Sequence, residues 1–111
     1  MRIAKLIFLF AFAALLSVYV FAQTGTSSLR GPGTDPKGAV IPGATVTISN
    51  PQTGYTRTVK SNSQGVYQFL EVPPATYKLT SDASGFATLT QANVILMVNT
   101  PAMLDLGMQV A

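Results

Sequence analysis

The chain contains no cysteine, no histidine and no tryptophan among its 111 residues, and only 10% of them are charged. Without cysteine there are no disulfides and no zinc–thiolate site, so the fold depends on its hydrophobic core alone. Without histidine there is no imidazole to activate a serine or cysteine nucleophile. These absences exclude thiol and histidine-dependent chemistry, and we expect no enzymatic activity.

The four carboxylates, Asp35, Glu71, Asp82 and Asp105, lie far apart along the sequence. A glycosidase needs two carboxylates at close range, and nothing local signals such a pair. Asp35 with nearby carbonyl groups is a calcium ligand or, more simply, the first residue of a turn. No glycine-rich nucleotide loop is present either. We therefore expect no catalytic residue, no cofactor and no metal site.

The amino terminus has the three-part pattern of a secretory leader. Two basic residues precede an uncharged apolar run, residues 6–21, and small side chains follow at the positions that a signal peptidase reads. We predict a signal-peptide helix over residues 1–22, with cleavage between Ala22 and Gln23. An uncleaved membrane anchor is the alternative, although the run is shorter than the roughly 20 residues that a bilayer span needs.

The leader accounts for most of the positive charge. Removing Arg2 and Lys5 leaves five basic and four acidic residues, a net charge of +1. A phosphate-binding surface would gather lysine and arginine on one face. We therefore expect no nucleic-acid partner, and contact with a membrane only through the leader or a receptor.

After residue 28 the hydrophobic pattern has a period of two, which is typical of half-buried antiparallel strands. Motifs with glycine, proline or asparagine separate the apolar runs and predict turns. We predict a flexible lead-in over residues 23–28 and one all-β domain over residues 29–111, without helix. Within it the pattern predicts strands over residues 44–50, 55–62, 66–70, 76–81, 86–91, 93–98 and 103–110.

Aromatic residues recur at strand spacing. Tyr67 with Phe69, and Tyr77 with the nearby leucine, fall on single faces of neighbouring strands, as expected for core partners. The alternative is a stacking platform for a sugar ring. Tyr55 and Phe86 lie nearer to turns, so they are the better candidates for ligand contact.

The run over residues 93–98 is apolar on both faces. Val94, Leu96 and Val98 would point inward, while Ile95 and Met97 would point outward and Met103 would add to the outward set. Either another layer covers this side or the patch is exposed. An exposed apolar strand is a docking or aggregation site, so these three outward residues are candidate partner contacts.

Two stretches, "GTDPKGAVIPGATVTI" and "TRTVKSNSQGVYQFLEVPPATYKLTSDASGF", carry a family pattern. They resemble the carboxypeptidase regulatory-like domain. That resemblance implies a transthyretin-like, carbohydrate-binding-like sandwich of seven antiparallel strands in Greek-key order, without the catalytic groups of carboxypeptidases. The matching positions are Gly31, Asp35, Gly38, Ile41, Pro42, Gly43, Ala44, Val46, Gly65, Tyr67, Phe69, Pro73, Tyr77, Leu79, Gly85 and Phe86.

The version of the pattern that follows the leader is similar to the amino-terminal extension of Oar-like TonB-dependent outer-membrane receptors. This similarity implies a periplasmic or outer-membrane location in a Gram-negative-type bacterium. It also implies a receptor plug or barrel as the partner. The chain would be a free-standing module, a truncated product or a fragment of a longer frame.

Several positions depart from the family pattern. Pro32 and Gly33 stand where a strand is usual, and since proline donates no ladder hydrogen bond we expect the first strand to be an edge or frayed. Ser81 replaces an inward valine, which reduces apolar burial by about 1–2 kcal/mol. Gln64 and Ala75 replace a turn aspartate and a glycine. We expect a fold of reduced stability.

Three functions follow as alternatives, of which the last, an enzyme accessory domain, would need a catalytic neighbour in the same operon or reading frame. The first is a non-catalytic exported module with a structural or interaction role, as part or remnant of a TonB-dependent receptor. The second is a carbohydrate-binding module that holds a sugar with Tyr55 or Phe86.

Overall fold

A computed structural model describes residues 25–111. The predicted leader, its cleavage site between Ala22 and Gln23, and the first residues of the predicted lead-in lie outside the described residues. Within residues 25–111 no helix is long and apolar enough to cross a membrane.

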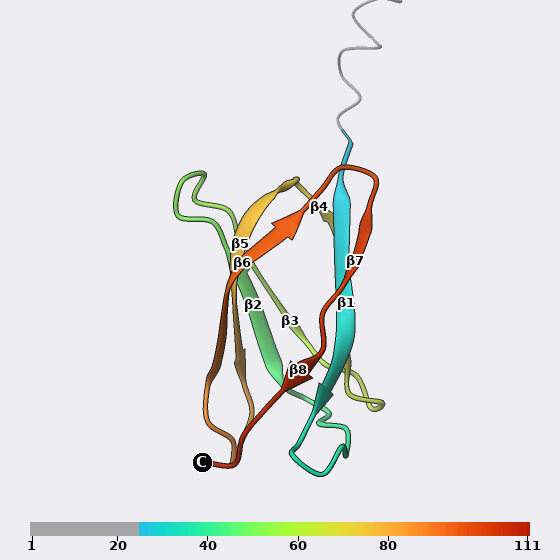
Figure 1. The fold of residues 1–111 in the computed structure, drawn as a ribbon, viewed down its shortest axis with the longest axis vertical. Helices are drawn as coiled ribbons and strands as arrows, with labels where there is room; N and C mark the ends of the chain where they lie inside the picture. Colours follow the sequence, from blue (N-terminus) through green and yellow to red (C-terminus); the bar gives the residue numbers. More distant parts are fainter. Residues whose placement is uncertain (1–24) are drawn as a thin grey trace, which may run out of the picture.

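The described chain consists of strands in two layers, which confirms the all-β sandwich (Figure 1). One sheet has the order β4-β1-β7, with β8 also paired to β1, and the other has the order β3-β2-β5-β6. The strands are β1 (Ser27–Thr34), β2 (Thr45–Ser49), β3 (Thr56–Lys60), β4 (Val66–Val72), β5 (Ala75–Asp82), β6 (Leu89–Leu96), β7 (Pro101–Met103) and β8 (Leu106–Gly107).

The strand pairing puts alternate residues of β2 and β5 on opposite faces. Ile48 pairs with Leu79 and both are buried, whereas Thr47 lies on the outer face opposite Thr80 and Thr58. The hydroxyls of Thr47 and Thr58 are 3.0 Å apart. Period-two alternation therefore becomes one apolar and one hydroxyl-rich face, as a half-buried sheet requires.

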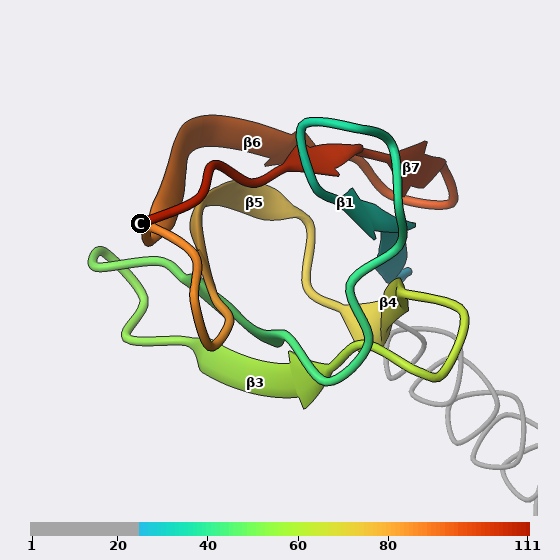
Figure 2. The same cartoon turned by 90° about the horizontal axis from the view of Figure 1, so that it is seen from below.

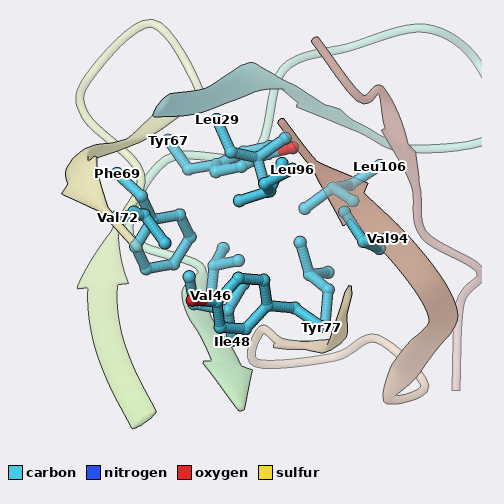
Figure 3. Close-up of a cluster of buried hydrophobic side chains, with 11 residues drawn as sticks. Leu29, Val46, Ile48, Tyr67, Phe69, Val72, Tyr77, Val94, Leu96 and Leu106 are labelled. Atoms are coloured by element: carbon cyan, nitrogen blue, oxygen red, sulfur yellow. The ribbon is translucent and has the colours of Figure 1, made fainter. Parts of the chain in front are cut away.

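The core fills the space between the sheets (Figure 3). Tyr67, Phe69, Tyr77 and Leu79 are at most 2% exposed, which confirms them as core residues. The rings of Tyr67 and Phe69 meet edge-on, with centroids 6.1 Å apart. The hydroxyl of Tyr67 donates to the Leu104 carbonyl at 2.6 Å. Buried rings cannot stack on a sugar, so the platform alternative for these residues is wrong.

The expected edge position of the first strand is also wrong. β1 is a central strand that pairs with β4 in antiparallel fashion and with β7 and β8 in parallel. Pro32 fits there because the ladder is interrupted beside it, between the pairs Arg30–Met103 and Gly33–Leu106. The missing donor of proline therefore falls in a gap. The sheet is mixed rather than purely antiparallel, and there are eight described strands rather than seven.

Strand boundaries differ most from the prediction in three places. Residues 86–91 and 93–98 merge into β6, because one extra residue at Asn93 is absorbed by a bulge with φ 59°. Residues 103–110 are divided between β7, β8 and an isolated bridge from Phe86 to Val110. β1 begins at Ser27, inside the predicted lead-in.

Candidate interaction surfaces

Tyr55 and Phe86 lie at opposite ends of the sandwich. Tyr55 follows the end of β2 where Ser49 pairs with Lys78, whereas Phe86 follows the end of β5 where Asp82 pairs with Thr45. They therefore do not form one platform.

Both rings are half-buried. Tyr55 meets Tyr77 edge-on with centroids 5.8 Å apart. Phe86 packs against a small cluster of Ile41, Ala44 and Met108. Each aromatic is thus partly engaged in packing, and their roles as ligand contacts stay predictions.

The three outward apolar residues are exposed in the described chain. Ile95 is 62% exposed, Met97 61% and Met103 73%. Val98, expected on the inner face, is 51% exposed because β6 ends at Leu96 and Val98 belongs to the following turn. We call these four residues the β6–β7 surface. Figure 2 shows β6 and β7 on the same side of the sandwich, away from β3 and β4.

The β6–β7 surface lies on a long uncharged segment. No aspartate, glutamate, lysine or arginine occurs from residue 83 to residue 104. β6 is the last strand of its sheet, so one of its edges has no strand partner in the described chain. Solvated edge strands usually carry charges or a bulge that prevents pairing with another chain. β6 has the bulge at Asn93 but no charge.

A groove of about 650 Å³ opens at the end of the sandwich where β1 begins. We call it the end groove. Most of its lining residues are polar. They come from β1 and the residue before it, from β3 and β4, and from the turn before β7 with the first residue of β7, namely Thr26, Ser27, Ser28, Arg57, Leu70, Glu71, Asn99, Thr100 and Pro101.

Hydrogen bonds hold the walls of the end groove together. The Arg57 guanidinium donates through Nη1 to the Leu70 carbonyl, which connects β3 to β4 across the two sheets. The Ser27 hydroxyl donates to the Thr100 carbonyl at 3.1 Å, and the backbone N–H of Asn99 donates to the Thr26 carbonyl at 2.9 Å. The groove is therefore a built part of the fold.

Backbone strain is concentrated at this end. The non-glycine residues with positive φ in the described chain are Glu71 (54°), Asn93 (59°) and Asn99 (53°). Glu71 and Asn99 line the end groove, and Asn93 lines a smaller groove of about 240 Å³ beside β5. Asparagine tolerates this conformation, but glutamate rarely adopts it. Sequence reasoning missed the end groove because the bulge that creates it has no local signal.

Two carboxylates of the described chain accept hydrogen bonds from residues close to them in the sequence. Asp35 accepts hydrogen bonds through Oδ1 from the backbone amides of Lys37 and Ala39, at 2.9 and 2.8 Å, which is the expected role of an aspartate that begins a turn. The Asp82 carboxylate accepts a hydrogen bond from the Thr88 hydroxyl. The described residues hold no group of three metal-ligating side chains.

The perturbed ionisable groups are core tyrosines. Burial, and secondarily the charge of Asp105, raises the pKa of Tyr67 well above its ordinary value. Burial, followed by the neighbouring Tyr55, raises the pKa of Tyr77. Both shifts reflect packed side chains with their protons retained.

Solved structures share the fold. A proposed carbohydrate-binding protein from Bacteroides uniformis is 16% identical with a TM-score of 0.62, over 77% of this chain and 42% of that one. A chain of a type II cohesin–X–dockerin complex from Acetivibrio cellulolyticus is 21% identical with a TM-score of 0.58, over 74% and 56%. Catechol 1,2-dioxygenase from Pseudomonas arvilla is 15% identical with a TM-score of 0.58, over 80% and 54%.

At these identities the likeness shows the fold alone, and this chain spans about half of each of those chains. No curated protein sequence matches it. The profile of the carboxypeptidase regulatory-like domain matches residues 28–109, nearly all of the described β-sandwich. The chain therefore belongs to the carboxypeptidase regulatory-like domain family.

Proposed function

We propose that the chain is a non-catalytic, exported interaction module that binds a protein partner through the β6–β7 surface. Its setting is the amino-terminal domain, or a truncated remnant, of a TonB-dependent outer-membrane receptor. The partner is then the plug or barrel of that receptor. The secretory pattern of residues 1–22 supports export to the periplasm or outer membrane.

The observation that carries the proposal is an exposed apolar surface on an uncharged edge. Ile95 and Met103 are each more than 60% exposed, and the segment that holds them has no charge from residue 83 to residue 104. Groups of exposed apolar residues on soluble proteins commonly mark interaction sites. An anionic membrane or a nucleic acid would require cations, which this surface lacks. An uncharged protein face is the matching partner.

The chemistry of the chain supports a role without catalysis. The whole sequence has neither histidine nor cysteine, and the strongest pKa perturbation is on Tyr67, a core residue whose hydroxyl is bonded to a backbone carbonyl. The matched family is a regulatory-like domain rather than a catalytic one.

Site-specific photo-crosslinking in cells tests the partner. A benzophenone amino acid replaces Ile95 or Met103, and a matched control carries it at Thr58, which is exposed on the outer face of β3. We expect crosslinks to a TonB-dependent receptor from positions 95 and 103 but not from 58. Equal crosslinking at all three positions, or none at 95 and 103, contradicts the proposal. Sequencing downstream of codon 111 tests the receptor setting, since a plug-and-barrel frame is expected there.

Carbohydrate binding is the second candidate function. The fold likeness to the proposed carbohydrate-binding protein of Bacteroides uniformis favours it. If Tyr55 or Phe86 holds the sugar, the alanine variant at that position will lose glycan binding while its circular dichroism stays β-rich. Binding that survives both substitutions shows that the sugar site, if there is one, lies elsewhere.

A further inference from the structure

We propose that the end groove binds a neutral saccharide, held between the guanidinium of Arg57 and the carboxylate of Glu71. This inference rests on the second candidate function and assigns it a different site from Tyr55 and Phe86. The groove offers about 650 Å³ and is lined by side chains of both hydrogen-bonding types.

Arg57 is positioned by the fold. It is exposed on β3, and its Nη1 donates to the Leu70 carbonyl on the facing sheet. A guanidinium has five N–H donors in a rigid plane. One contact to a backbone carbonyl therefore fixes the plane, and the remaining donors are available to a ligand in the groove.

Glu71 is positioned by a bulge. Between the pairs Ser27–Val72 and Leu29–Phe69, β4 has two residues, Leu70 and Glu71, where β1 has only Ser28. Glu71 takes up the extra length with φ 54°. Such strain at a non-glycine residue is concentrated at ligand sites in folded proteins, and bulges commonly re-aim a side chain beside such sites.

The chemistry of the lining selects the ligand class. Arg57 only donates hydrogen bonds and ionised Glu71 only accepts them, whereas each hydroxyl of a sugar does both. A pair of adjacent sugar hydroxyls can therefore accept from Arg57 and donate to Glu71. Thr26, Ser28 and Asn99 add neutral polar groups.

The charge and the apolar parts of the end groove narrow the class of ligand further. One cation and one carboxylate cancel, so the groove does not favour a phosphate or an acidic sugar. Leu70 and Pro101 supply apolar surface for the C–H face of a ring. Among residues 25–111 no aromatic side chain lines the groove, so we expect weak binding, with a Kd of about 0.1 mM or higher.

An NMR titration tests the inference directly. Isotope-labelled protein is titrated with neutral trisaccharides (cellotriose, maltotriose, mannotriose and chitotriose) and with trigalacturonate as the acidic comparison. We expect at least one neutral trisaccharide to shift the amide signals of Ser28, Glu71 and Asn99, and trigalacturonate to bind at least 10-fold more weakly.

Substitutions in the end groove test whether Arg57 and Glu71 hold the saccharide. Glu71→Gln and Arg57→Lys should each weaken binding by at least 10-fold, whereas Lys60→Gln, which removes an exposed charge from the same strand as Arg57, should leave it unchanged. Thermal unfolding of each variant checks that the fold is retained. If Arg57→Lys fails to fold, Glu71→Gln still tests the site, because it keeps the length of the side chain and removes only its charge.

Three outcomes overturn the inference. If a saccharide binds and shifts signals around Tyr55 or Phe86 while those of Ser28, Glu71 and Asn99 stay unshifted, the carbohydrate function survives and the end groove is the wrong site. If all variants bind like the unmodified protein, Arg57 and Glu71 do not hold the ligand. If no neutral trisaccharide binds up to tens of millimolar, the inference is wrong, and the crosslinking at positions 95 and 103 still decides the leading function independently.

Discussion

Gly31 should be the least replaceable glycine of the core strands. It lies in β1, and a Cβ atom added there would come within 2.0 Å of the Leu104 carbonyl oxygen and 2.8 Å of its carbon. Both are backbone atoms, so no side-chain rotation relieves the clash. Gly31→Ala must push the segment that joins β7 to β8 away from β1.

The size of the effect follows from the contacts of Leu104. Its amide donates to the Arg30 carbonyl at 3.0 Å, and its carbonyl accepts from the Tyr67 hydroxyl at 2.6 Å. Each hydrogen bond contributes about 0.5–1.5 kcal/mol net, and a buried hydroxyl left without a partner costs about 1–3 kcal/mol. We therefore expect Gly31→Ala to lower the free energy of unfolding by about 2–4 kcal/mol. For a domain of this size that lowers Tm by roughly 10–30 °C.

Urea and thermal unfolding followed by circular dichroism measure the change. Gly33→Ala is the matched control, because it lies in the same strand and its added Cβ would be 3.7 Å from the nearest atom, the Gly65 carbonyl oxygen. That variant should be neutral or slightly stabilising, since alanine restricts the unfolded chain more than glycine does. If Gly31→Ala and Gly33→Ala differ by less than about 0.5 kcal/mol, a spread typical of neutral surface substitutions, the close approach of Leu104 is refuted.

Three further substitutions probe the core and the bulge. The pKa of Tyr67 is raised by burial and then by Asp105. The protonated hydroxyl therefore contributes its full amount to the free energy of unfolding below about pH 10, the pKa of tyrosine in the unfolded chain, and this contribution is lost as the pH rises above that value. Stability should then fall by up to about 1.4 kcal/mol per pH unit; Tyr67→Phe should flatten this alkaline loss in urea titrations at pH 8 to 11.5, and an unchanged slope would contradict it. Ser81 is fully buried with the Met108 sulfur, a weak acceptor, as its partner at 3.4 Å, so Ser81→Ala should raise the free energy of unfolding by about 1 kcal/mol; a loss above 1 kcal/mol would show that the hydroxyl is well satisfied. Glu71→Gly should raise it by about 0.5–1 kcal/mol in the same assay, because glycine removes the left-handed strain at φ 54°, and a destabilised variant would argue against strain there.

Local alternation was sufficient to predict the core. Tyr67 and Phe69, like Tyr77 and Leu79, are two residues apart on one face, and all four are buried. This succeeds because the period of a strand depends on the chain itself and not on which strand lies beside it.

The position of β1 depends on distant residues and could not be predicted in the same way. Pro32 and Gly33 argued for an edge, but the partners of β1 include residues 101–107, far along the chain. Gly31 was the available signal, because glycine inside a strand often marks close approach of another backbone.

The two candidate surfaces also differ in whether the local sequence predicts them. The β6–β7 surface was predictable, because Ile95 and Met97 stand out from an uncharged run that is apolar on both faces. The end groove arises where one extra residue of β4 meets β1 and where Arg57 crosses from the other sheet. Neither event leaves a mark in the local sequence.

Methionine oxidation tests most directly whether the β6–β7 surface is covered in the cell. Met97 and Met103 are 61% and 73% exposed, whereas Met108 is 1% exposed and provides an internal reference. In the purified protein, dilute peroxide should oxidise Met97 and Met103 much faster than Met108, because access controls the rate. In intact cells a bound partner should slow oxidation of Met97 and Met103 to near that of Met108. Equal rates for Met97 and Met103 in cells and in the purified protein would contradict a docked surface.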